Sequence, residues 1–291
     1  MTVLDRNGPV RLGLPTGRMK AGVNALLADA GIHLKLSDRG YRPQMDLPGF
    51  EVKVLKPQSI VEMLHLGSRD VGFAGADWVS ELKADLVQLV DTGLDPVKIV
   101  AAAPAALLQE GRLPAKPLVV ASEYETITRE WIARSGLDAT FMRAYGATEV
   151  FPPEDADCIV DNTATGSTLR ANNLTIIDVI ARSSTRLYAS PKAMRDSSKR
   201  ERIGHLVMLV ESVLAARERV MVEVNVDSQS LDGVIRTLPC MREPTVSPLR
   251  GDSGFAVKAA VPRDQLPSII PQIKAAGGTD VIVTGLSQIV P

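Results

Sequence analysis

Cysteine and histidine are scarce in this sequence. Its 291 residues include two cysteines, Cys158 and Cys240, and three histidines, His33, His65 and His205. So few cysteines cannot build the disulfide framework of a small secreted domain, which predicts a reducing compartment. Cys158 lies in an apolar run and is expected to be a small buried residue. The histidines lack the spacing of metal ligands, which excludes a zinc site.

Aromatic residues and basic segments are also lacking. Aromatic side chains make up 4% of the chain, and 33 Lys and Arg residues balance 34 Asp and Glu residues, for a net charge of −1. Nucleic-acid binding normally requires a basic surface, and binding of single strands requires aromatic rings that stack on bases. We therefore expect no nucleic-acid partner.

Long apolar runs are missing as well. No run is long enough to span a bilayer, and the N-terminus lacks the charged-then-apolar pattern of a secretory signal. These absences predict a cytoplasmic protein without a membrane-spanning segment. The remaining composition, 45% hydrophobic and 23% charged, is that of a globular chain, and the length allows two or three domains.

The first two thirds of the chain alternate short apolar segments with helical patterns. Apolar segments at 10–14, 50–55 and 118–122 are each followed by a helical pattern. Such alternation predicts α/β domains with parallel sheets and helical crossovers. Further predicted strands lie at 86–90, 97–102, 174–181 and 185–189, and a short helix is predicted at 146–151.

A break in composition at 103–117, with small residues followed by Gly111, Pro114 and Pro117, predicts a hinge between two α/β domains. The first domain is expected to comprise 1–103 and 185–216, and the second 104–184. Residues 217–291 show a separate pattern of strand, helix, two strands, helix and strand. This βαββαβ order is that of the ferredoxin-like unit. Its second strand, at 244–249, contains two prolines, which indicates an edge strand.

The most informative stretch is 157–170. Cys158, Ile159 and Val160 indicate a buried strand, Asp161 closes it, and a loop of small hydroxyl residues precedes a new helix. Such a loop presents several backbone N–H groups to an anion, and glycine lets the backbone approach it closely. A terminal acid suits sugar hydroxyls or a hydrated metal. The stretch therefore predicts a ligand that carries both a phosphate and a ribose.

The loop at 165–168 and three charged residues elsewhere, Arg18, Asp77 and Glu149, could each have a role in binding or a purely structural role. Ser and Thr near 165–168 are common helix caps, so an ordinary strand-to-helix turn is the alternative. Arg18 either clamps a polyphosphate through its planar guanidinium or lies on the surface of a turn. Asp77 either contacts a ligand or caps the next helix. Glu149 either binds a ribose hydroxyl or a magnesium-bound water, or is simply solvated.

Taken together, the motifs resemble one enzyme family. Gly146–Glu149, Asp161 and Thr165–Asn172 are similar to the region around the phosphoribosyl-pyrophosphate (PRPP) loop of ATP phosphoribosyltransferases, which catalyse the first step of histidine biosynthesis. Pro244–Leu249 resembles the regulatory domain of the long form of that family. The stretch 14–18 reads Leu-Pro-Lys-Gly-Arg in the family, whereas Thr16 replaces the lysine here.

The resemblance implies roles for individual residues. PRPP is expected to contact Asp161, Thr163, Ala164, Thr165, Gly166, Ser167 and Thr168. ATP is expected to contact Leu14, Gly17, Arg18, Gly75, Ala76 and Asp77. Catalysis is expected to depend on Asp161 and Arg18, and Mg²⁺ is expected to bind Glu149 and Asp161. Histidine, as feedback inhibitor, is expected to contact Glu223, Asn225, Thr245 and Ser247.

The resemblance also implies a fold and a reaction. Two hinged domains of the type II periplasmic binding-protein fold would carry catalysis, followed by the ferredoxin-like regulatory domain, in a homo-hexamer built from dimers. The implied reaction joins N1 of ATP to PRPP, releasing pyrophosphate. The residues alone leave two alternatives open, a non-enzymatic hinged module that binds small molecules and a phosphoribosyltransferase for another base.

Overall fold

The computed structural model describes residues 8–35, 40–251 and 253–290, so the first seven residues of the predicted first domain lie outside it. Backbone contacts divide the chain into two units. The first unit comprises Met1–Ala25 and His33–Gly204, and the second comprises Leu26–Ile32 and His205–Pro291. This division is coarser than the three domains expected from the sequence, whose boundaries stay predictions.

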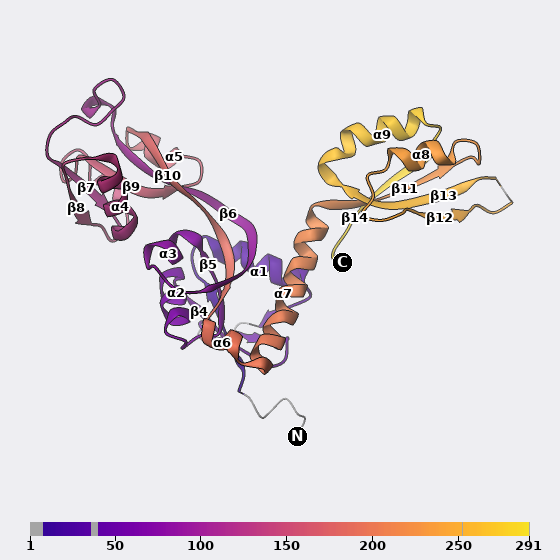
Figure 1. The fold of residues 1–291 in the computed structure, drawn as a ribbon, viewed down its shortest axis with the longest axis horizontal. Helices are drawn as coiled ribbons and strands as arrows, with labels where there is room; N and C mark the ends of the chain where they lie inside the picture. Colours follow the sequence, from indigo (N-terminus) through magenta and orange to yellow (C-terminus); the bar gives the residue numbers. More distant parts are fainter. Residues whose placement is uncertain (1–7, 36–39, 252, 291) are drawn as a thin grey trace. The chain divides into compact units, whose positions relative to one another are not determined.

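An eight-stranded sheet forms the centre of the first unit (Figure 1), with the strand order β4-β1-β5-β10-β6-β9-β7-β8. Its strands are β1 (Val10–Pro15), β4 (Phe50–Leu55), β5 (Val71–Gly75), β6 (Val87–Pro104), β7 (Leu118–Ser122), β8 (Ala139–Arg143), β9 (Cys158–Thr163) and β10 (Leu174–Ala189). The sequence did not predict the separate short pair β2 (Leu34–Lys35) and β3 (Gln44–Met45).

Helices connect most of these strands. They are α1 (Met19–Asp29), α2 (Pro57–His65), α3 (Ala76–Glu81), α4 (Glu125–Ser135), α5 (Ser167–Ala171), α6 (Pro191–Arg195) and α7 (Ser197–Arg217). The carboxylate of Asp196 accepts hydrogen bonds from the backbone N–H groups of Ser198 and Lys199, which explains where α7 begins.

The expectation of purely parallel sheets is wrong. β1 pairs in parallel with β4 and β5, and β7 pairs in parallel with β8 and β9. In the middle of the sheet, however, β10 runs antiparallel to β5 and β6, and β6 runs antiparallel to β9. The sheet is mixed because two long strands, rather than helical crossovers, carry the chain between its two halves (Figure 1).

Two pairs of predicted strands each form one strand in the structure. The segments expected at 86–90 and 97–102 are joined in β6, and those at 174–181 and 185–189 are joined in β10. Shifts in register between these strands accommodate the polar residues that interrupted the apolar pattern. The predicted split reflects this local polarity, which pairing with the neighbouring strand overrides.

The helix predicted at 146–151 is a single 3₁₀ turn, Thr148–Val150. Gly146 and Ala147 have φ angles of +100° and +48°, which keep both residues out of a right-handed helix. The turn therefore begins two residues later than the sequence suggests.

The second unit contains the predicted βαββαβ order, which the structure confirms. Its elements are β11 (Arg219–Val226), α8 (Leu231–Thr237), β12 (Thr245–Pro248), β13 (Phe255–Pro262), α9 (Leu266–Ala275) and β14 (Thr279–Gly285). The sheet order is β12-β13-β11-β14, with antiparallel neighbours throughout and β12 at an edge, as its prolines predicted. Helices α8 and α9 cover one face of this sheet (Figure 1).

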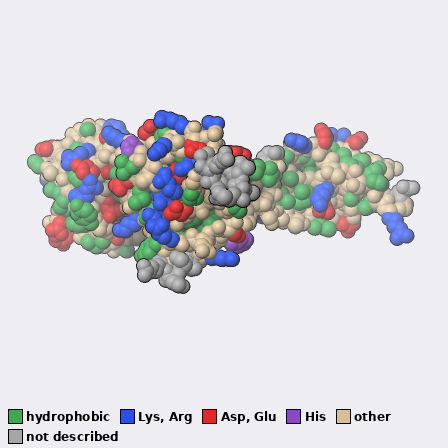
Figure 2. Space-filling view, turned by 90° about the horizontal axis from the view of Figure 1, so that it is seen from below, with side chains coloured by type: hydrophobic (Ala, Val, Ile, Leu, Met, Phe, Trp, Pro, Cys, Tyr) green, Lys and Arg blue, Asp and Glu red, His purple; other side chains and the backbone are tan. Residues whose placement is uncertain are grey.

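Surface charge follows the balanced composition. On the face drawn in Figure 2, positive and negative side chains are interspersed rather than gathered by sign. Within the part of the chain that the structure describes, no helix combines the length and apolar character needed to cross a bilayer.

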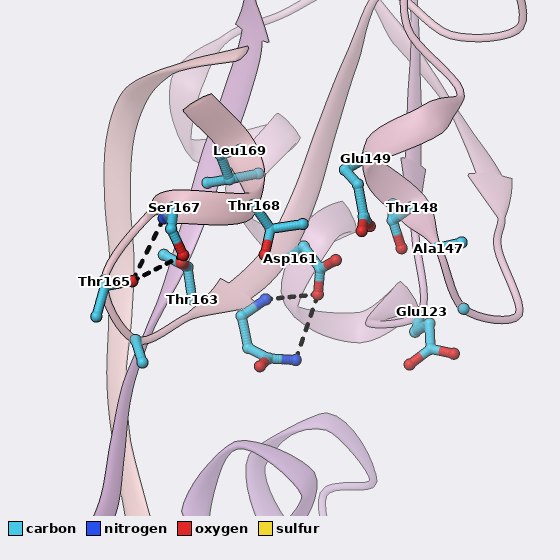
Figure 3. Close-up of a pocket in the computed structure, with 13 residues that line it drawn as sticks. Glu123, Ala147, Thr148, Glu149, Asp161, Thr163, Thr165, Ser167, Thr168 and Leu169 are labelled. Atoms are coloured by element: carbon cyan, nitrogen blue, oxygen red, sulfur yellow. Dashed lines mark hydrogen bonds between the residues drawn. The ribbon is translucent and has the colours of Figure 1, made fainter. Parts of the chain in front are cut away.

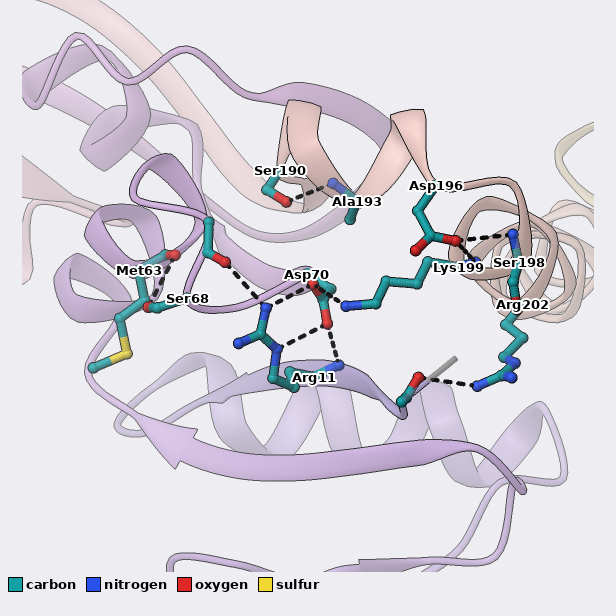
Figure 4. Close-up of polar contacts among 12 residues, drawn as sticks. Arg11, Met63, Ser68, Asp70, Ser190, Ala193, Asp196, Ser198, Lys199 and Arg202 are labelled. Atoms are coloured by element: carbon teal, nitrogen blue, oxygen red, sulfur yellow. Dashed lines mark hydrogen bonds and ion pairs between the residues drawn. The ribbon is translucent and has the colours of Figure 1, made fainter. Parts of the chain in front are cut away.

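A buried carboxylate joins three elements of the first unit (Figure 4). Asp70, which precedes β5 and is 2% exposed, accepts hydrogen bonds from Arg11 Nε at 3.1 Å and Nη2 at 3.0 Å and from Lys199 Nζ at 2.9 Å. Burial raises the pKa of this carboxyl, but the hydrogen bonds from Arg11 and Lys199 outweigh burial and hold the pKa below its ordinary value. Asp70 therefore binds β1 to the start of α7.

Asp70→Asn should lower the free energy of unfolding by about 3 kcal/mol, because it leaves two partly buried cations without their counter-charge. Urea unfolding at pH 7 measures this change. The matched control is Asp29→Asn, which breaks an exposed ion pair with Arg217 and should cost less than about 1 kcal/mol. Equal losses in the two variants would contradict the assignment.

Candidate functional site

A cavity of about 370 Å³ opens beyond the carboxyl ends of β7 and β9, which are parallel neighbours. Asp161 lies between the loop after β9 on one side and Thr148 and Glu149 on the other (Figure 3). The cavity is lined by Glu123, Gly146, Ala147, Thr148, Glu149, Asp161, Asn162, Thr163, Ala164, Thr165, Ser167, Thr168 and Leu169. All expected PRPP contacts except Gly166 therefore line one cavity, and Gly166 shapes its loop.

The loop is held in shape by its own polar groups. The N–H of Gly166 donates to the hydroxyl of Thr163 at 2.9 Å, and the Arg170 guanidinium donates to the carbonyl of Thr165 at 3.1 Å. Gly166 has a φ of +75°, and a Cβ there would lie 3.1 Å from Arg170 Nη1. Both the backbone conformation and the space thus favour glycine at this position.

The capping explanation for the hydroxyl residues holds only in part. The N-cap residue of α5 is Gly166, which has no side chain to cap the helix, but the Thr165 hydroxyl accepts a hydrogen bond from the N–H of Ser167, the first residue of α5, at 3.4 Å. The hydroxyl of Thr165 donates to Ser167 Oγ at 3.0 Å, and Thr165, Ser167 and Thr168 all line the cavity. The hydroxyls of Ser167 and Thr168 are therefore placed to donate hydrogen bonds to a ligand.

Three carboxylates share the cavity. The pKa of Asp161 is raised to about 6, chiefly by burial and also by the negative charges of Glu149 and Glu123, which together outweigh the hydrogen bonds from the Asn162 backbone and the Thr148 side chain. The N–H of Asn162 donates to Asp161 Oδ1 at 2.6 Å. Such a concentration of negative charge favours a ligand that brings hydroxyl donors or a cation.

The carboxylates fit a magnesium ion that arrives with its substrate. Among the residues that the structure describes, no three His, Cys, Asp or Glu side chains are grouped to hold a metal by themselves. Mg²⁺, however, keeps several waters and is usually bound through one or two carboxylates and the phosphates of a substrate. Glu149 and Asp161 line the same cavity and can provide those carboxylates.

The residues expected to contact ATP lie elsewhere in the first unit. None of the six lines this cavity. Leu14 is a buried residue of β1, Gly75 ends β5, and these parallel neighbours bring the two stretches to one edge of the sheet. Arg18 follows Gly17, whose φ is +70°, and is exposed.

Asp77 does not cap α3, so that structural explanation is wrong. The N-cap residue is Gly75, and no side chain caps the helix. The carboxylate of Asp77 is 7% exposed and accepts hydrogen bonds from the hydroxyls of Ser183 at 2.6 Å and Tyr124 at 2.7 Å. It is held there by long-range partners, Ser183 of β10 and Tyr124 at the start of α4, which satisfy both of its oxygens.

The four residues expected to bind histidine lie on one face of the second sheet. Glu223 of β11 and Thr245 of β12 both pair with Lys258 of β13, which lies between them. Two residues further along the strands, Asn225 and Ser247 both pair with Ala256 in the same way. They face away from the buried valines of β11. Thr245 also lines a cavity of about 390 Å³ in this unit.

Sequence reasoning missed Glu123, Thr148 and Asn162. Glu123 comes directly after β7, just as Asp161 comes directly after the buried residues of β9, and these two strands are neighbours. An acid at the end of a neighbouring strand could therefore have indicated Glu123. That signal requires the strand order, which the local sequence does not contain. Thr148 is buried and Asn162 is exposed, and neither stands out from its neighbours in the sequence.

Glu149→Gln should lower the pKa of Asp161 from about 6 toward its ordinary value, because it removes a like charge from the cavity. Because the pKa of this carboxyl is raised in the folded protein, the free energy of unfolding falls as the pH rises from about 4 to 6. The variant should make this fall smaller. Carbon NMR of the labelled carboxyl measures the pKa. Glu130→Gln, exposed on α4, is the matched control, and equal titrations of Asp161 in both variants would contradict the assignment.

Comparison with known proteins places the chain in a family. The profile HisG, described as ATP phosphoribosyltransferase, matches residues 56–212, and the profile of the HisG C-terminal domain matches residues 216–288. An ATP phosphoribosyltransferase of Desulforudis audaxviator is 36% identical over 97% of this chain and 99% of its own length. One of Pelotomaculum thermopropionicum is 34% identical over 97% of this chain and 99% of its own length.

A solved structure shares the fold. It is titled ATP phosphoribosyl transferase (HisG:HisZ) complex from Thermotoga maritima, and its matched chain has a TM-score of 0.63 and 24% identity. The match covers 71% of this chain and 98% of that chain. With both sequence profiles present and relatives matched over nearly their whole length, this chain belongs to the ATP phosphoribosyltransferase family and has the long form's C-terminal domain.

Proposed function

We propose that this enzyme transfers the phosphoribosyl group of PRPP to N1 of ATP, which yields phosphoribosyl-ATP and pyrophosphate. The observation that carries the proposal is the cavity in Figure 3, where a loop rich in amide and hydroxyl donors faces three carboxylates. A phosphorylated sugar has both matching ends, acceptor oxygens on its phosphate and donor hydroxyls on its ribose.

The loop is the proposed site of the 5′-phosphate. Among the described residues that line the cavity, none is Lys or Arg, so a phosphate there would depend on neutral donors. Backbone N–H groups and the hydroxyls of Ser167 and Thr168 are such donors, and a left-handed glycine lets them converge. This arrangement binds an anion without placing a cation beside Asp161.

Asp161 and Glu149 are the proposed ligands of the ribose hydroxyls. When Mg²⁺ is bound, it would be held by these carboxylates together with phosphate oxygens, and it would offset the charge on the departing pyrophosphate. As N1 of the adenine approaches, the bond between the anomeric carbon and pyrophosphate breaks, and the sugar inverts. Carboxylates near the ring stabilise the positive charge that the ring develops.

Positioning provides much of the rate in such a transfer. No residue need form a covalent intermediate, and holding two reactants in line contributes on the order of 7–11 kcal/mol in the best cases. We propose that Leu14, Gly17, Arg18, Gly75, Ala76 and Asp77 form the ATP side of the site. Arg18 would be its cation for the phosphates, since Thr16 carries no charge.

The wider organisation completes the proposal. Two domains would close on the substrates, as hinged domains of the type II periplasmic binding-protein fold do. The first would comprise 1–103 and 185–216, and the second 104–184. Residues 217–291 would regulate them, in a cytoplasmic homo-hexamer built from dimers. The two long strands between the halves of the first sheet support a hinged arrangement, because they are the main covalent connections there.

The test of the proposed function is pyrophosphate release from PRPP and ATP in the presence of Mg²⁺. Turnover should require all three and should produce phosphoribosyl-ATP. Turnover with a different base would instead indicate another phosphoribosyltransferase, and binding of both compounds without product would indicate a binding module.

In this assay, Gly166→Val should raise the KM for PRPP by roughly tenfold or more, because a side chain at this φ moves the loop that would hold the phosphate. The matched control is Gly136→Val, at the C-cap of α4, where φ is +65° and a Cβ meets no atom within 4 Å. It introduces similar backbone strain outside the cavity and should leave the KM unchanged. Unchanged kinetics in Gly166→Val would remove the loop from the site.

We further propose that histidine inhibits the enzyme by binding the second sheet. Glu223, Asn225, Thr245 and Ser247 share one face of that sheet and offer carboxylate, amide and hydroxyl groups to an amino acid. Glu223 is paired with Lys258 at 2.6 Å, so this face already contains both charges that a zwitterion requires.

Thr245→Ala should raise the histidine concentration for half inhibition by roughly tenfold, since it removes a hydroxyl from this face. Pyrophosphate release at increasing histidine measures the change. Thr237→Ala is the matched control, because Thr237 lies on α8 and its hydroxyl donates to the carbonyl of Val234. Inhibition that is equally sensitive in both variants would exclude Thr245 from the effector site.

A further inference from the structure

A chain of hydrogen bonds, buried at Asp77 and part-buried at Asn162, connects the two halves of the first sheet. Ser183 of β10 donates to Asp77 Oδ1 at 2.6 Å, and the hydroxyl of Tyr124 donates to Asp77 Oδ2 at 2.7 Å. The side-chain amide of Asn162 donates to the oxygen of Tyr124 at 3.1 Å. The tyrosine hydroxyl thus donates to one half of the sheet and accepts from the other.

The geometry of Tyr124 is tightly constrained. Its side chain is 1% exposed, and its ring stacks on Trp78 of α3 with centroids 4.7 Å apart. Its acceptor, Asp77, is itself buried and fixed by Ser183. Because buried polar groups are costly when unpaired, the hydroxyl has little freedom to turn away from these partners.

The chain of hydrogen bonds continues to the carboxylate in the cavity. Asn162 donates to Asp161 Oδ1 twice, from its backbone N–H at 2.6 Å and from its side-chain amide at 3.3 Å. The same amide group therefore binds both Tyr124 and Asp161. Because Tyr124 fixes this amide, it fixes one of the donors that orient the Asp161 carboxylate, the others being the Asn162 backbone N–H and the Thr148 side chain.

We propose that Tyr124 is a positioning residue that holds Asp161 for the ribose through the Asn162 side chain. This role rests on the proposed function, in which Asp161 binds the sugar. The proposal also gives Asp77, one of the residues proposed for the ATP side, a second role. Its carboxylate accepts the hydrogen bond of the Tyr124 hydroxyl and so holds the tyrosine in place. Tyr124 touches neither substrate in this account and acts only through its neighbours.

The test uses the full-length enzyme and the variant Tyr124→Phe, which keeps the ring and removes the hydroxyl. The KM for PRPP should rise by roughly three- to tenfold, as expected for one lost hydrogen bond, with a smaller change in kcat. In the background of Asn162→Ala, the same substitution should have almost no further effect on the KM. Additive effects of the two substitutions would overturn the proposal.

The matched control is Glu81→Gln. Glu81 also joins α3 to α4, because its carboxylate accepts the N–H groups of Thr126 and Ile127 at 3.0 Å each, but it has no contact with Asn162. It should lower the free energy of unfolding and leave the KM for PRPP within twofold. A rise in KM equal to that of Tyr124→Phe would show a general structural effect and contradict the specific role.

A readout without turnover separates this inference from the proposed function. The side-chain amide signal of Asn162, assigned by its loss in Asn162→Ala, should shift in the NMR spectrum of Tyr124→Phe and stay in place in Glu81→Gln. If the signal shifts but PRPP and ATP give no product, the proposed function fails and the coupling stands. If the signal does not shift, the coupling fails even where product forms.

Discussion

The antiparallel pairing of β6 with β10 is the interaction on which the first unit depends. β10 connects this pair to β5, β1 and β4, and β6 connects it to β9, β7 and β8. Ile99, Ala101 and Ala103 of β6 are buried in one core cluster, and Val100 and Ala102 are buried in another. Since both faces of β6 are covered, its apolar run fixes the centre of the sheet and thereby the two sets of parallel strands.

This arrangement also places the site. Asp161 pairs with Val100 of β6, so the position of the PRPP loop follows from the central strands. The same loop faces Glu123, which follows the neighbouring strand β7. Carboxylates thus gather where strands end together, and neutral donors rather than cations face them. In the proposed function, such a site would accept an anionic sugar without neutralising the carboxylates that face its hydroxyls.

The fold of the second unit depends more on patterns within single strands and helices than the fold of the first unit does. Strictly alternating apolar residues in β11 place its valines against α8 and α9, and polar residues on the opposite face. Because each strand and helix of this unit shows its own apolar pattern, the order of elements was readable from the sequence. The grouping of Glu223 with Thr245 was not readable, since it depends on β13 lying between them and on its register.

The sequence by itself determined the type of most elements, the loop around Gly166, the acid at Asp161 and the family to which these motifs belong. Those features depend on neighbours within a few residues, which apolar periodicity and turn chemistry reveal. Only the tertiary structure decided the long strands, the mixed sheet, the burial of Asp77, the place of Glu123 in the cavity beside the loop after β9 and the contact of Tyr124 with Asn162. These depend on strand order and register, which join residues distant in the chain and leave no local signal.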